Sequence, residues 1–583
     1  MPALPALLCL ALLAAGATPM ALAGPECGGP ATPIHRIQGH TERSPLVGQT
    51  VAVEGILTRD ARQPGGFSGF YLQQPDPQTD NTPSTSEALF VYTRKTAGRV
   101  GERLRVVGTV KEFYGLTELA SVRELRVCGR GDLPAPVPVS LPWSLPPESL
   151  ENMRVRFTGP LTVIDNDNLA RYGELVLAGQ DQIMATEQLA PGPSARALTQ
   201  QHMAQRITLD DGLGRKNPEP VAWLRNRNTV RAGDSVTQLE GVLDYRFGQW
   251  RLQPTSRPQF QNQNPRPPAP VKAPGTIRIM TLNLQNYFNG DGRGSGFPTA
   301  RGATSRAGFQ AQSRRLITGI LAARPDILAV TELENDGYGP DSAAADLARK
   351  LGKAWTLVQT PGSNGNDAIR TAVLYRSDAV EPAGAPARLT ARGPTPMSRP
   401  PLAQAFHANG TSLRFWIVVP HLKSKSCRNA ETAEQDTGDG QSCFNRQRTL
   451  SAQAITGWLG QLTGQDRTDT PILITGDLNS YAREAPLAHF REAGFISLVH
   501  RNHPCRADQC EHYTYRYRGQ KGSLDYALGN PSLLPWVQQA VTWNINADEP
   551  PALGYRNAPE LGGPWRASDH NPVLTDLKLS RGQ

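Results

Sequence analysis

The chain has 583 residues, more than one hydrophobic core usually serves, so we expect two to four domains. Hydrophobic residues make up 38% and charged residues 19%, which is typical of globular proteins and excludes a chain that is mainly disordered. The formal net charge is +9, and a basic exported protein often meets a polyanion such as nucleic acid.

The first 23 residues carry no charged side chain and end in an A-x-A cleavage pattern at positions 21–23. This predicts a secretory signal peptide (1–23) removed before Gly24. A membrane anchor is the less favoured interpretation, because Gly16 and Pro19 interrupt the short apolar run. We therefore expect a secreted protein, extracellular or periplasmic, with no membrane anchor after cleavage.

Six cysteines follow this segment, and an even number in an exported chain favours disulfides. The last pair has an alternative, because His503 and His512 flank it at a spacing that could form a zinc site. Export favours the disulfide there too. Sequential pairing predicts Cys27–Cys128, Cys427–Cys443 and Cys505–Cys510.

Two proline-rich segments, 133–148 and 261–275, divide the rest of the chain. Before each of them, short alternating strands with glycine-containing turns predict a small all-β domain. A weak internal repeat relates the two regions, and its strand–turn–strand pattern resembles OB-fold barrels, which often hold single-stranded nucleic acid. Two β spacers without a ligand are an equal alternative. The predicted domains are 24–132 and 149–258, a Pro-rich linker at 259–275, and a C-terminal domain at 276–581.

After residue 275 the pattern changes to alternating strands and helices. Segments 309–323 and 449–462 have apolar residues at helical spacing, and each precedes an apolar strand. Other strands follow turns and look like hairpin partners. This alternation predicts mixed sheets with helices on both outer faces.

Several strands of this region end in polar side chains that metal or phosphate chemistry could use. Each one alone has a structural explanation, such as a helix cap or a satisfied core histidine. Their repetition at one end of a sheet favours a functional role instead, because ligand-binding and catalytic sites in such folds lie at that end of the strands. The residues are Asn283, Glu332, His421, Asp477, Asn479, Asp525, Asp569 and His570.

The ordered motifs TLNL, TELE, PHLKSK, GDLNS, SLDYAL and SDHNPV resemble the endonuclease/exonuclease/phosphatase superfamily, which includes deoxyribonuclease I and the major AP endonucleases. The resemblance covers roughly the C-terminal half. The stretches YFNGDG, FPTARGA, DGQSCFN and YRGQKGSLDYAL are similar to secreted bacterial nucleases with OB-like domains before the catalytic domain. The implied fold is α+β, a two-sheet α/β sandwich of the deoxyribonuclease I type preceded by two small all-β OB-like barrels.

The resemblance also implies roles for the strand-end residues. Asn283, Glu332 and Asp569 would lie near the metal, and Asp477 would touch it as well. Hard oxygen ligands favour Mg²⁺, with Ca²⁺ or Mn²⁺ as alternatives. Asp477 and Asn479 would position the attacking water. His570, oriented by Asp525, would act at the phosphate as base or stabiliser, and His421 would be a candidate general acid.

The same resemblance implies contacts to the substrate. Arg399 matches a phosphate-contacting arginine, and Lys423 and Lys425 would contact the DNA backbone, with solvated surface residues as the alternative. One departure concerns Pro420, since related nucleases have asparagine before this histidine and proline has no N–H to donate. This leaves the orientation of His421 undetermined.

We therefore expect a secreted, Mg²⁺-dependent endonuclease that hydrolyses phosphodiester bonds of DNA, with RNA as a further substrate. The first alternative is a phosphoesterase of the same fold acting on a lipid or inositol phosphate. The second is a non-catalytic nucleic-acid-binding protein.

Overall fold

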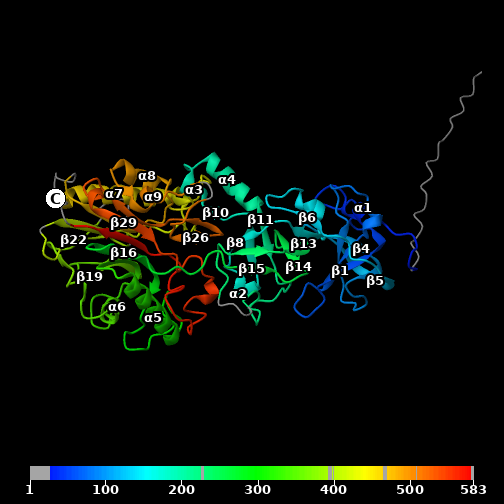
Figure 1. The fold of residues 1–583 in the computed structure, drawn as a ribbon, viewed down its shortest axis with the longest axis horizontal. Coiled ribbons are helices and arrows are strands. Elements are labelled where there is room, and N and C mark those ends of the chain that lie inside the picture. The colour runs from blue at the N-terminus through cyan, green and yellow to red at the C-terminus, as the bar shows by residue number, and fades with distance from the viewer. Residues whose placement is uncertain are drawn as a thin grey trace, which may run out of the picture. The chain divides into compact units, whose positions relative to one another are not determined.

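The computed structural model describes residues 26–579 except 225–228, 391–396, 398, 412, 464–468 and 507–508. The expected signal peptide at 1–23 lies outside the described residues. Within those residues, no helix combines the length and apolar character needed to cross a membrane. The chain divides into two compact units, one up to residue 135 together with 148–153, and one of 136–147 together with 154 onward (Figure 1).

The first unit is a closed five-stranded barrel with the strand order β1-β2-β3-β5-β4. Alternate strand residues point inward and form its core, which includes Val53, Phe70 and Leu104. The disulfide Cys27–Cys128 joins its beginning to the end of its last strand. The elements are α1 (Ile34–Gln38), β1 (Thr50–Asp60), β2 (Gly69–Gln73), η1 (Asp76–Gln78), β3 (Ala88–Tyr92), β4 (Glu102–Phe113), β5 (Leu116–Arg130) and η2 (Pro147–Leu150).

The second unit begins with a nine-stranded sheet in the order β15-β12-β8-β9-β11-β14-β13-β7-β6, which we call the sheet domain. It has two ends among the described residues, whereas a second small barrel was expected. The strands β15 and β6 extend it at its two edges. Its elements are β6 (Val137–Val139), β7 (Arg154–Phe157), β8 (Leu161–Asp165), α2 (Leu169–Tyr172), β9 (Leu175–Ala178), α3 (Ala185–Gln188), α4 (Pro193–Ala204), β11 (Arg206–Leu209), β12 (Ser235–Thr237), β13 (Glu240–Arg246), β14 (Gln249–Pro254) and β15 (Gln259–Gln261).

The weak internal repeat corresponds to one hairpin in each unit. In the β4–β5 hairpin, Tyr114 and Gly115 both have positive φ, at 52° and 86°. In the β13–β14 hairpin, Phe247 and Gly248 have φ of 55° and 72°. Two successive positive φ angles are typical of the two-residue turn that matches strand twist. The repeat therefore records a shared hairpin, not a shared sheet topology.

The rest of the second unit, which we call the two-sheet domain, contains a six-stranded sheet, β18-β19-β17-β16-β30-β29, and a seven-stranded sheet, β20-β22-β23-β24-β28-β25, with β21 beside β22. A short third sheet pairs β26 and β27 with β10 (Gln182–Ile183). The elements are β16 (Ile277–Tyr287), α5 (Arg306–Ala323), β17 (Ile327–Glu334), α6 (Ala343–Leu351), β18 (Trp355–Leu357), β19 (Ile369–Arg376), β20 (Val380–Pro382), β21 (Ala387–Arg388), β22 (Leu402–Ala408), β23 (Arg414–Val419), η3 (Thr432–Glu434), α7 (Asn445–Thr463), β24 (Ile472–Asp477), α8 (Ala485–Glu492), β25 (Ile496–Ser497), α9 (Leu498–Asn502), β26 (Tyr515–Tyr517), β27 (Gln520–Gly522), β28 (Asp525–Gly529), η5 (Leu534–Trp536), β29 (Val537–Thr542), η6 (Pro551–Leu553) and β30 (Val573–Leu577).

These elements form four layers. One apolar cluster joins the facing sides of the two sheets, with Ile279 and Val373 from one and Phe406 and Leu473 from the other. A second cluster packs α5 and α6 on the outer face of the six-stranded sheet, and a third packs α7 and α8 on the other sheet. Figure 1 shows these helices on opposite sides of the strands. The expected sandwich of two sheets between helices is therefore present in the C-terminal half.

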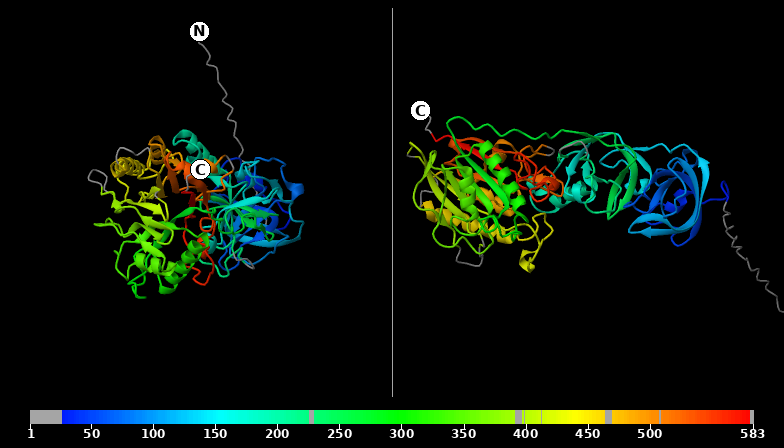
Figure 2. Two further views of the ribbon diagram at one scale, coloured as in Figure 1. Left: turned by 60° about the vertical axis from the view of Figure 1, so that its left-hand side comes forward. Right: turned by 90° about the horizontal axis from the view of Figure 1, so that it is seen from below.

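The segment between β15 and β16 lies in the expected Pro-rich linker, and it runs along the two-sheet domain and is bound to it (Figure 2). Lys272 pairs with Asp326, and the Ala273 N–H donates to Asp576 Oδ2 at 2.9 Å. Arg278 of β16 donates to the Pro270 and Val271 carbonyls of the segment at 2.7 and 2.8 Å. These contacts make the segment a fixed connection within the second unit.

Replacement of Cys27 and Cys128 by serine should lower the free energy of unfolding of the first unit by about 2–4 kcal/mol, because the disulfide closes a long loop in the unfolded chain. Thermal unfolding of the full chain, followed by limited proteolysis, measures this change. Serine at Cys427 and Cys443, which lie in the second unit, is the control and should leave the barrel's transition in place. An unchanged barrel transition in the first variant would contradict the prediction.

Candidate active site

The candidate site begins where two strands from different sheets end opposite each other. The hydroxyls of Thr281 in β16 and Thr475 in β24 bond across the space between the sheets. Two residues further along, Asn283 Nδ2 donates to Asp477 Oδ2 at 3.1 Å. Both side chains are buried. The pairing of the sheets thus brings together two residues that lie 194 positions apart.

Glu332 comes from β17, beside β16, and its backbone is unusual. Its φ is +58°, which few residues other than glycine adopt, and the pairing of β17 with β19 shifts between Val330 and Leu333. Such a bulge changes the direction of a side chain. Burial raises the pKa of Glu332, and the nearby Asp569 carboxylate raises it further. Two acidic groups therefore lie together, and the charges of His570 and Arg399 offset only part of the increase in the Glu332 pKa.

Asp477 is the last residue of β24 and is completely enclosed. Burial raises its pKa to about 7, and the Asp525 carboxylate contributes to the shift. The Asn479 N–H donates to Asp477 Oδ1 at 2.9 Å, while the Asn479 side-chain amide donates to the Leu422 carbonyl at 3.2 Å. Asp477 therefore titrates near neutral pH, and Asn479 holds it in place.

Asp525 and His570 form a close pair. His570 Nδ1 lies 2.7 Å from Asp525 Oδ2, and the Tyr515 ring lies 4.7 Å from the imidazole. Burial alone would lower the pKa of His570, but the carboxylates of Asp525, Asp569 and Asp477 raise it well above its usual value. The pair fixes the imidazole with Nδ1 toward Asp525.

His421 follows β23 and lies on the other side of Asp477, with Nε2 3.4 Å from Asp477 Oδ2. Arg399 Nη1 lies 3.3 Å from Nδ1 and 3.0 Å from Nε2 of this ring. Burial and the Arg399 charge lower the pKa of His421 well below its usual value. Arg399 and a backbone bridge to Asp477 orient the ring, which resolves the question raised by Pro420. A neutral imidazole is poorly suited to the general-acid role expected for it.

Arg301, in the FPTARGA stretch, was not among the expected site residues. Its Nη1 lies 2.9 Å from Asp367 Oδ1, and Arg399 Nε lies 3.8 Å from Asp367 Oδ2. The charge of Arg301 also contributes to the lowered pKa of His421. The resemblance of FPTARGA to secreted nucleases was the only sequence signal for it.

The two lysines of PHLKSK lie in different surroundings. Lys423 Nζ lies 4.7 Å from the centre of the Phe444 ring. Lys425 Nζ is 2.6 Å from the buried Glu484 carboxylate and donates to the Gln441 carbonyl at 2.8 Å. Burial lowers the pKa of Lys425 to about 8. Its side chain is therefore held inside the fold, which differs from the expected contact with DNA.

The segment 566–571, which we call the His570 loop, is held by residues that sequence reasoning missed. Ser568 Oγ donates to the Asn283 carbonyl at 2.6 Å and accepts from the His570 N–H at 3.1 Å. Asn546 Oδ1 accepts from the Ala567 N–H at 3.0 Å, and Asn546 Nδ2 donates to the His570 carbonyl at 2.7 Å. No motif around Asn546 indicated this role, because it depends on a contact between two loops.

The donor set fits a hard divalent cation. The carboxylates of Glu332, Asp477 and Asp569 gather beside the Asn283 side chain, and carboxylate crowding contributes to the raised pKa values of Glu332 and Asp477. One buried carboxylate oxygen, Asp525 Oδ1, has no hydrogen-bond partner among the described residues. A bound cation would reduce the repulsion between these carboxylates.

All three expected disulfides are formed, Cys27–Cys128, Cys427–Cys443 and Cys505–Cys510. The zinc alternative for the last pair is therefore not supported. Three disulfides in one chain suggest an extracellular protein.

Residues 280–570 match the Endonuclease/Exonuclease/phosphatase family, and residues 147–264 match a family described as a domain of unknown function, DUF8508. No curated protein matches the chain. Similar solved structures include the catalytic domain of human Nocturnin with a bound sulfate anion, at 19% identity, covering 52% of this chain and 95% of that one, with a TM-score of 0.34. A mannosyl-6-phosphatase of Bacteroides thetaiotaomicron (15%, 52% and 99%) and an AP endonuclease of Leishmania major (13%, 52% and 87%) also have TM-scores of 0.34.

Replacement of Gly476 by alanine should destabilise the second unit by about 1–3 kcal/mol, because the new Cβ would lie 2.2 Å from the Pro420 carbonyl oxygen. Denaturant unfolding measures the change. Gly457→Ala in α7 is the matched control, since its Cβ would meet nothing within 4 Å and alanine favours a helix. Equal effects of the two substitutions would contradict the close approach of Gly476 to Pro420.

Without a divalent cation, stability should fall as the pH rises from about 4 to 8. The folded state raises the pKa of Asp477 from 3.8 to about 7, so its contribution is full below the unfolded value and is lost as the pH passes the folded one. Mg²⁺ should therefore raise the melting temperature more at pH 8 than at pH 5, compared with EDTA. Asp477→Asn should reduce this difference. An equal increase at both pH values would contradict the prediction.

Proposed function

Since residues 280–570 form a domain of the Endonuclease/Exonuclease/phosphatase family, we propose that the protein is a secreted, metal-dependent endonuclease that hydrolyses phosphodiester bonds of DNA, and also of RNA. The observation that carries this proposal is the convergence of Asp477, Asp525 and His570, whose ligand atoms all lie within 4.8 Å of one another. Next to them, Asn283, Glu332 and Asp569 complete an oxygen-rich cluster.

The proposed chemistry uses each group according to its electrostatics. Asn283, Glu332, Asp477 and Asp569 would hold a divalent cation such as Mg²⁺, which would neutralise charge on the phosphate oxygens. Asp477 would accept the proton of the attacking water, and Asn479 keeps its carboxylate oriented. As the water oxygen bonds to phosphorus, the bond to the leaving oxygen breaks and this oxygen takes a proton from solvent water, so the products are a phosphate monoester and an alcohol.

The two histidines have different proposed roles. His570 is a hydrogen-bond donor to the phosphoryl oxygens, because its raised pKa keeps the imidazole protonated and Asp525 fixes its orientation. His421 stays neutral and, together with Arg399, forms the wall of the phosphate site. Arg301 reaches the same place through Asp367 and is a further phosphate-binding candidate.

Two features of the first unit favour a polymeric substrate. Its closed barrel follows the strand order 1-2-3-5-4, which we take as OB-like. Tyr92, Phe113 and Tyr114 are exposed on it, with Tyr114 at 83%, and exposed aromatic rings are suited to stacking on bases. We propose that this unit binds nucleic acid. The three disulfides support export, which we ascribe to a signal peptide at 1–23.

The test is to incubate purified protein with circular plasmid, single-stranded DNA, RNA, sphingomyelin and an inositol phosphate, with Mg²⁺ or EDTA. We expect Mg²⁺-dependent nicking of the closed circle, which requires an internal cut. His570→Ala and Asp477→Ala should each lower the rate at least 100-fold while the melting curve persists.

Cleavage of a lipid or inositol phosphate alone would assign the protein to the other substrate class of the same fold. Binding of DNA without cleavage of any substrate would indicate a binding protein. Wild-type turnover in either variant would show that the site residues are wrong. Lys425→Ala tests the buried lysine, and it should change stability more than affinity for DNA.

A further inference from the structure

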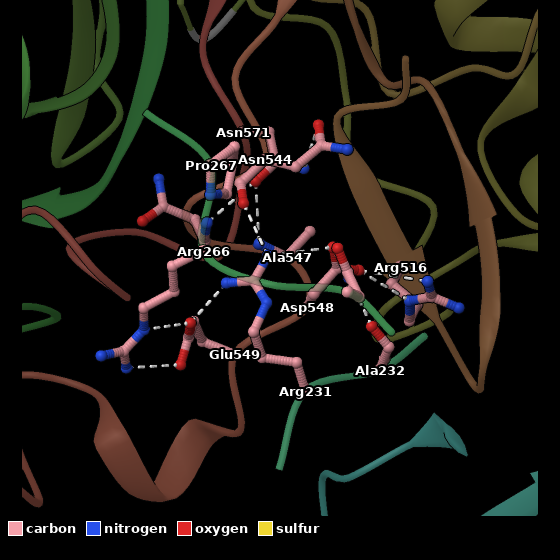
Figure 3. Close-up of polar contacts among 12 residues, drawn as sticks. Arg231, Ala232, Arg266, Pro267, Arg516, Asn544, Ala547, Asp548, Glu549 and Asn571 are labelled. Carbon is pink, nitrogen blue, oxygen red and sulfur yellow. Dashed lines mark hydrogen bonds and ion pairs between the residues drawn. The ribbon is translucent and has the colours of Figure 1, made fainter. Parts of the chain in front are cut away.

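The sheet domain contacts the two-sheet domain through a buried group of charges (Figure 3). The Arg231 side chain is 1% exposed and faces Asp548 and Glu549, which are both 0% exposed. Its Nη2 lies 3.5 Å from Asp548 Oδ2 and donates to the Asn544 carbonyl at 2.8 Å, while Nη1 pairs with Glu549. Burial of a charge is strongly unfavourable unless it is paired. Arg231 of the sheet domain and the carboxylates of Asp548 and Glu549 in the two-sheet domain therefore neutralise one another.

Two further arginines complete this group, which we call the Arg231 cluster. Arg266, from the segment after β15, contacts both carboxylate oxygens of Glu549 at 2.8 and 2.9 Å. Arg516 in β26 lies 3.1 Å from Asp548 Oδ1 and 2.6 Å from Asp181 Oδ1 of the sheet domain. Figure 3 shows Arg266 and Arg516 approaching Glu549 and Asp548 from different sides.

Backbone pairing reinforces this contact. The strand β10 pairs with β27 in parallel, and the Met184 N–H donates to the Lys521 carbonyl at 2.9 Å. Glu187 of the sheet domain accepts from the Ser523 N–H at 3.3 Å. Because β26 pairs with β27 and carries Tyr515, the sheet domain also anchors the ring that lies over His570.

The Arg231 cluster lies next to the residues that hold the His570 loop. Asp548 and Glu549 belong to the segment 544–549, which also contains Asn546. The N–H groups of Asn546 and Ala547 donate to Asn571 Oδ1 at 2.9 and 3.0 Å, and Arg566 Nη1 donates to the Asn546 carbonyl at 2.9 Å. Both ends of the His570 loop are therefore bonded to a segment that the arginines fix.

We propose that the sheet domain is a positioning part of the catalytic centre, with Arg231 and Arg266 holding segment 544–549 and, through it, the loop of Asp569 and His570. This inference rests on the proposed function, in which Asp569 would hold the cation and His570 donates to the substrate phosphate. Displacement of a reacting group by about 1 Å can lower a rate about 100-fold, so rigid support of this loop has a direct effect on turnover. The region that matches a domain of unknown function thereby supports the catalytic loop of the same chain.

Hydrogen–deuterium exchange of the full chain tests the connection without substrate. In Arg231→Gln, peptides covering 544–549 and 566–571 should exchange at least tenfold faster, because the amides of Arg566 and Ala567 lose their fixed acceptors on Ile545 and Asn546. Arg266→Gln is a milder second variant, since its side chain is 21% exposed, and it remains useful if Arg231→Gln does not fold.

The matched control is Arg251→Gln. Arg251 is also buried in the sheet domain, but it pairs with Asp210 and Glu174 of the same domain, at 2.6 and 2.7 Å. It should lower stability while leaving exchange in 566–571 unchanged. Equal exchange in the 566–571 peptides of all variants, or the same increase in the control, would overturn the inference.

Steady-state kinetics on plasmid provides the second measurement. Arg231→Gln or Arg266→Gln should lower kcat at least tenfold with less than a threefold change in KM, and Arg251→Gln should retain wild-type kcat below its melting temperature. Unchanged kcat in both interface variants would overturn the positioning role. If the wild-type protein cleaves no substrate, the proposed function fails, while the exchange result still decides whether the sheet domain holds the loop.

Discussion

The candidate site depends on the face-to-face packing of two β-sheets. The Thr281–Thr475 contact joins β16 to β24 across the apolar layer, and the next inward-facing pair, Asn283 and Asp477, meets at the end of the same two strands. Because side chains along a strand alternate, a residue two positions beyond a core contact points to the same side. The hydrophobic layer thereby determines where the polar groups meet.

Enclosure then gives these polar groups unusual proton affinities. Burial and neighbouring acids raise the pKa of Asp477 and Glu332, and the same acids raise the pKa of His570. On the other side of Asp477, burial and Arg399 act in the opposite sense on His421. The two histidines on either side of Asp477 therefore differ in charge at neutral pH, which supports the different roles proposed for them.

The sheet domain contributes to this arrangement from a distance. Buried ion pairs add little net stability compared with apolar packing, but the loss of one partner leaves an uncompensated charge. Arg231, Asp548 and Glu549 therefore favour one docked arrangement strongly over misaligned ones. Since segment 544–549 also bonds the His570 loop, the docked arrangement of the sheet domain also determines where Asp569 and His570 lie. The region that looked like a separate β module is thus part of the same compact unit.

The sequence by itself determined several local features. These are the motif residues at strand ends, the three cysteine pairs, the helices at 309–323 and 449–462, and the strand–turn–strand repeat of the two β regions. Local patterns suffice for these features, because they follow from side-chain periodicity, turn chemistry and pairing by order along the chain. Only the tertiary structure decided that Lys425 is enclosed by Glu484, that Arg399 orients His421, and that Asn546 and Arg231 support the His570 loop. It also decided that the described residues of the second β region form one nine-stranded sheet. These features arise from contacts between residues up to several hundred positions apart, and their energies depend on burial, which no local pattern records.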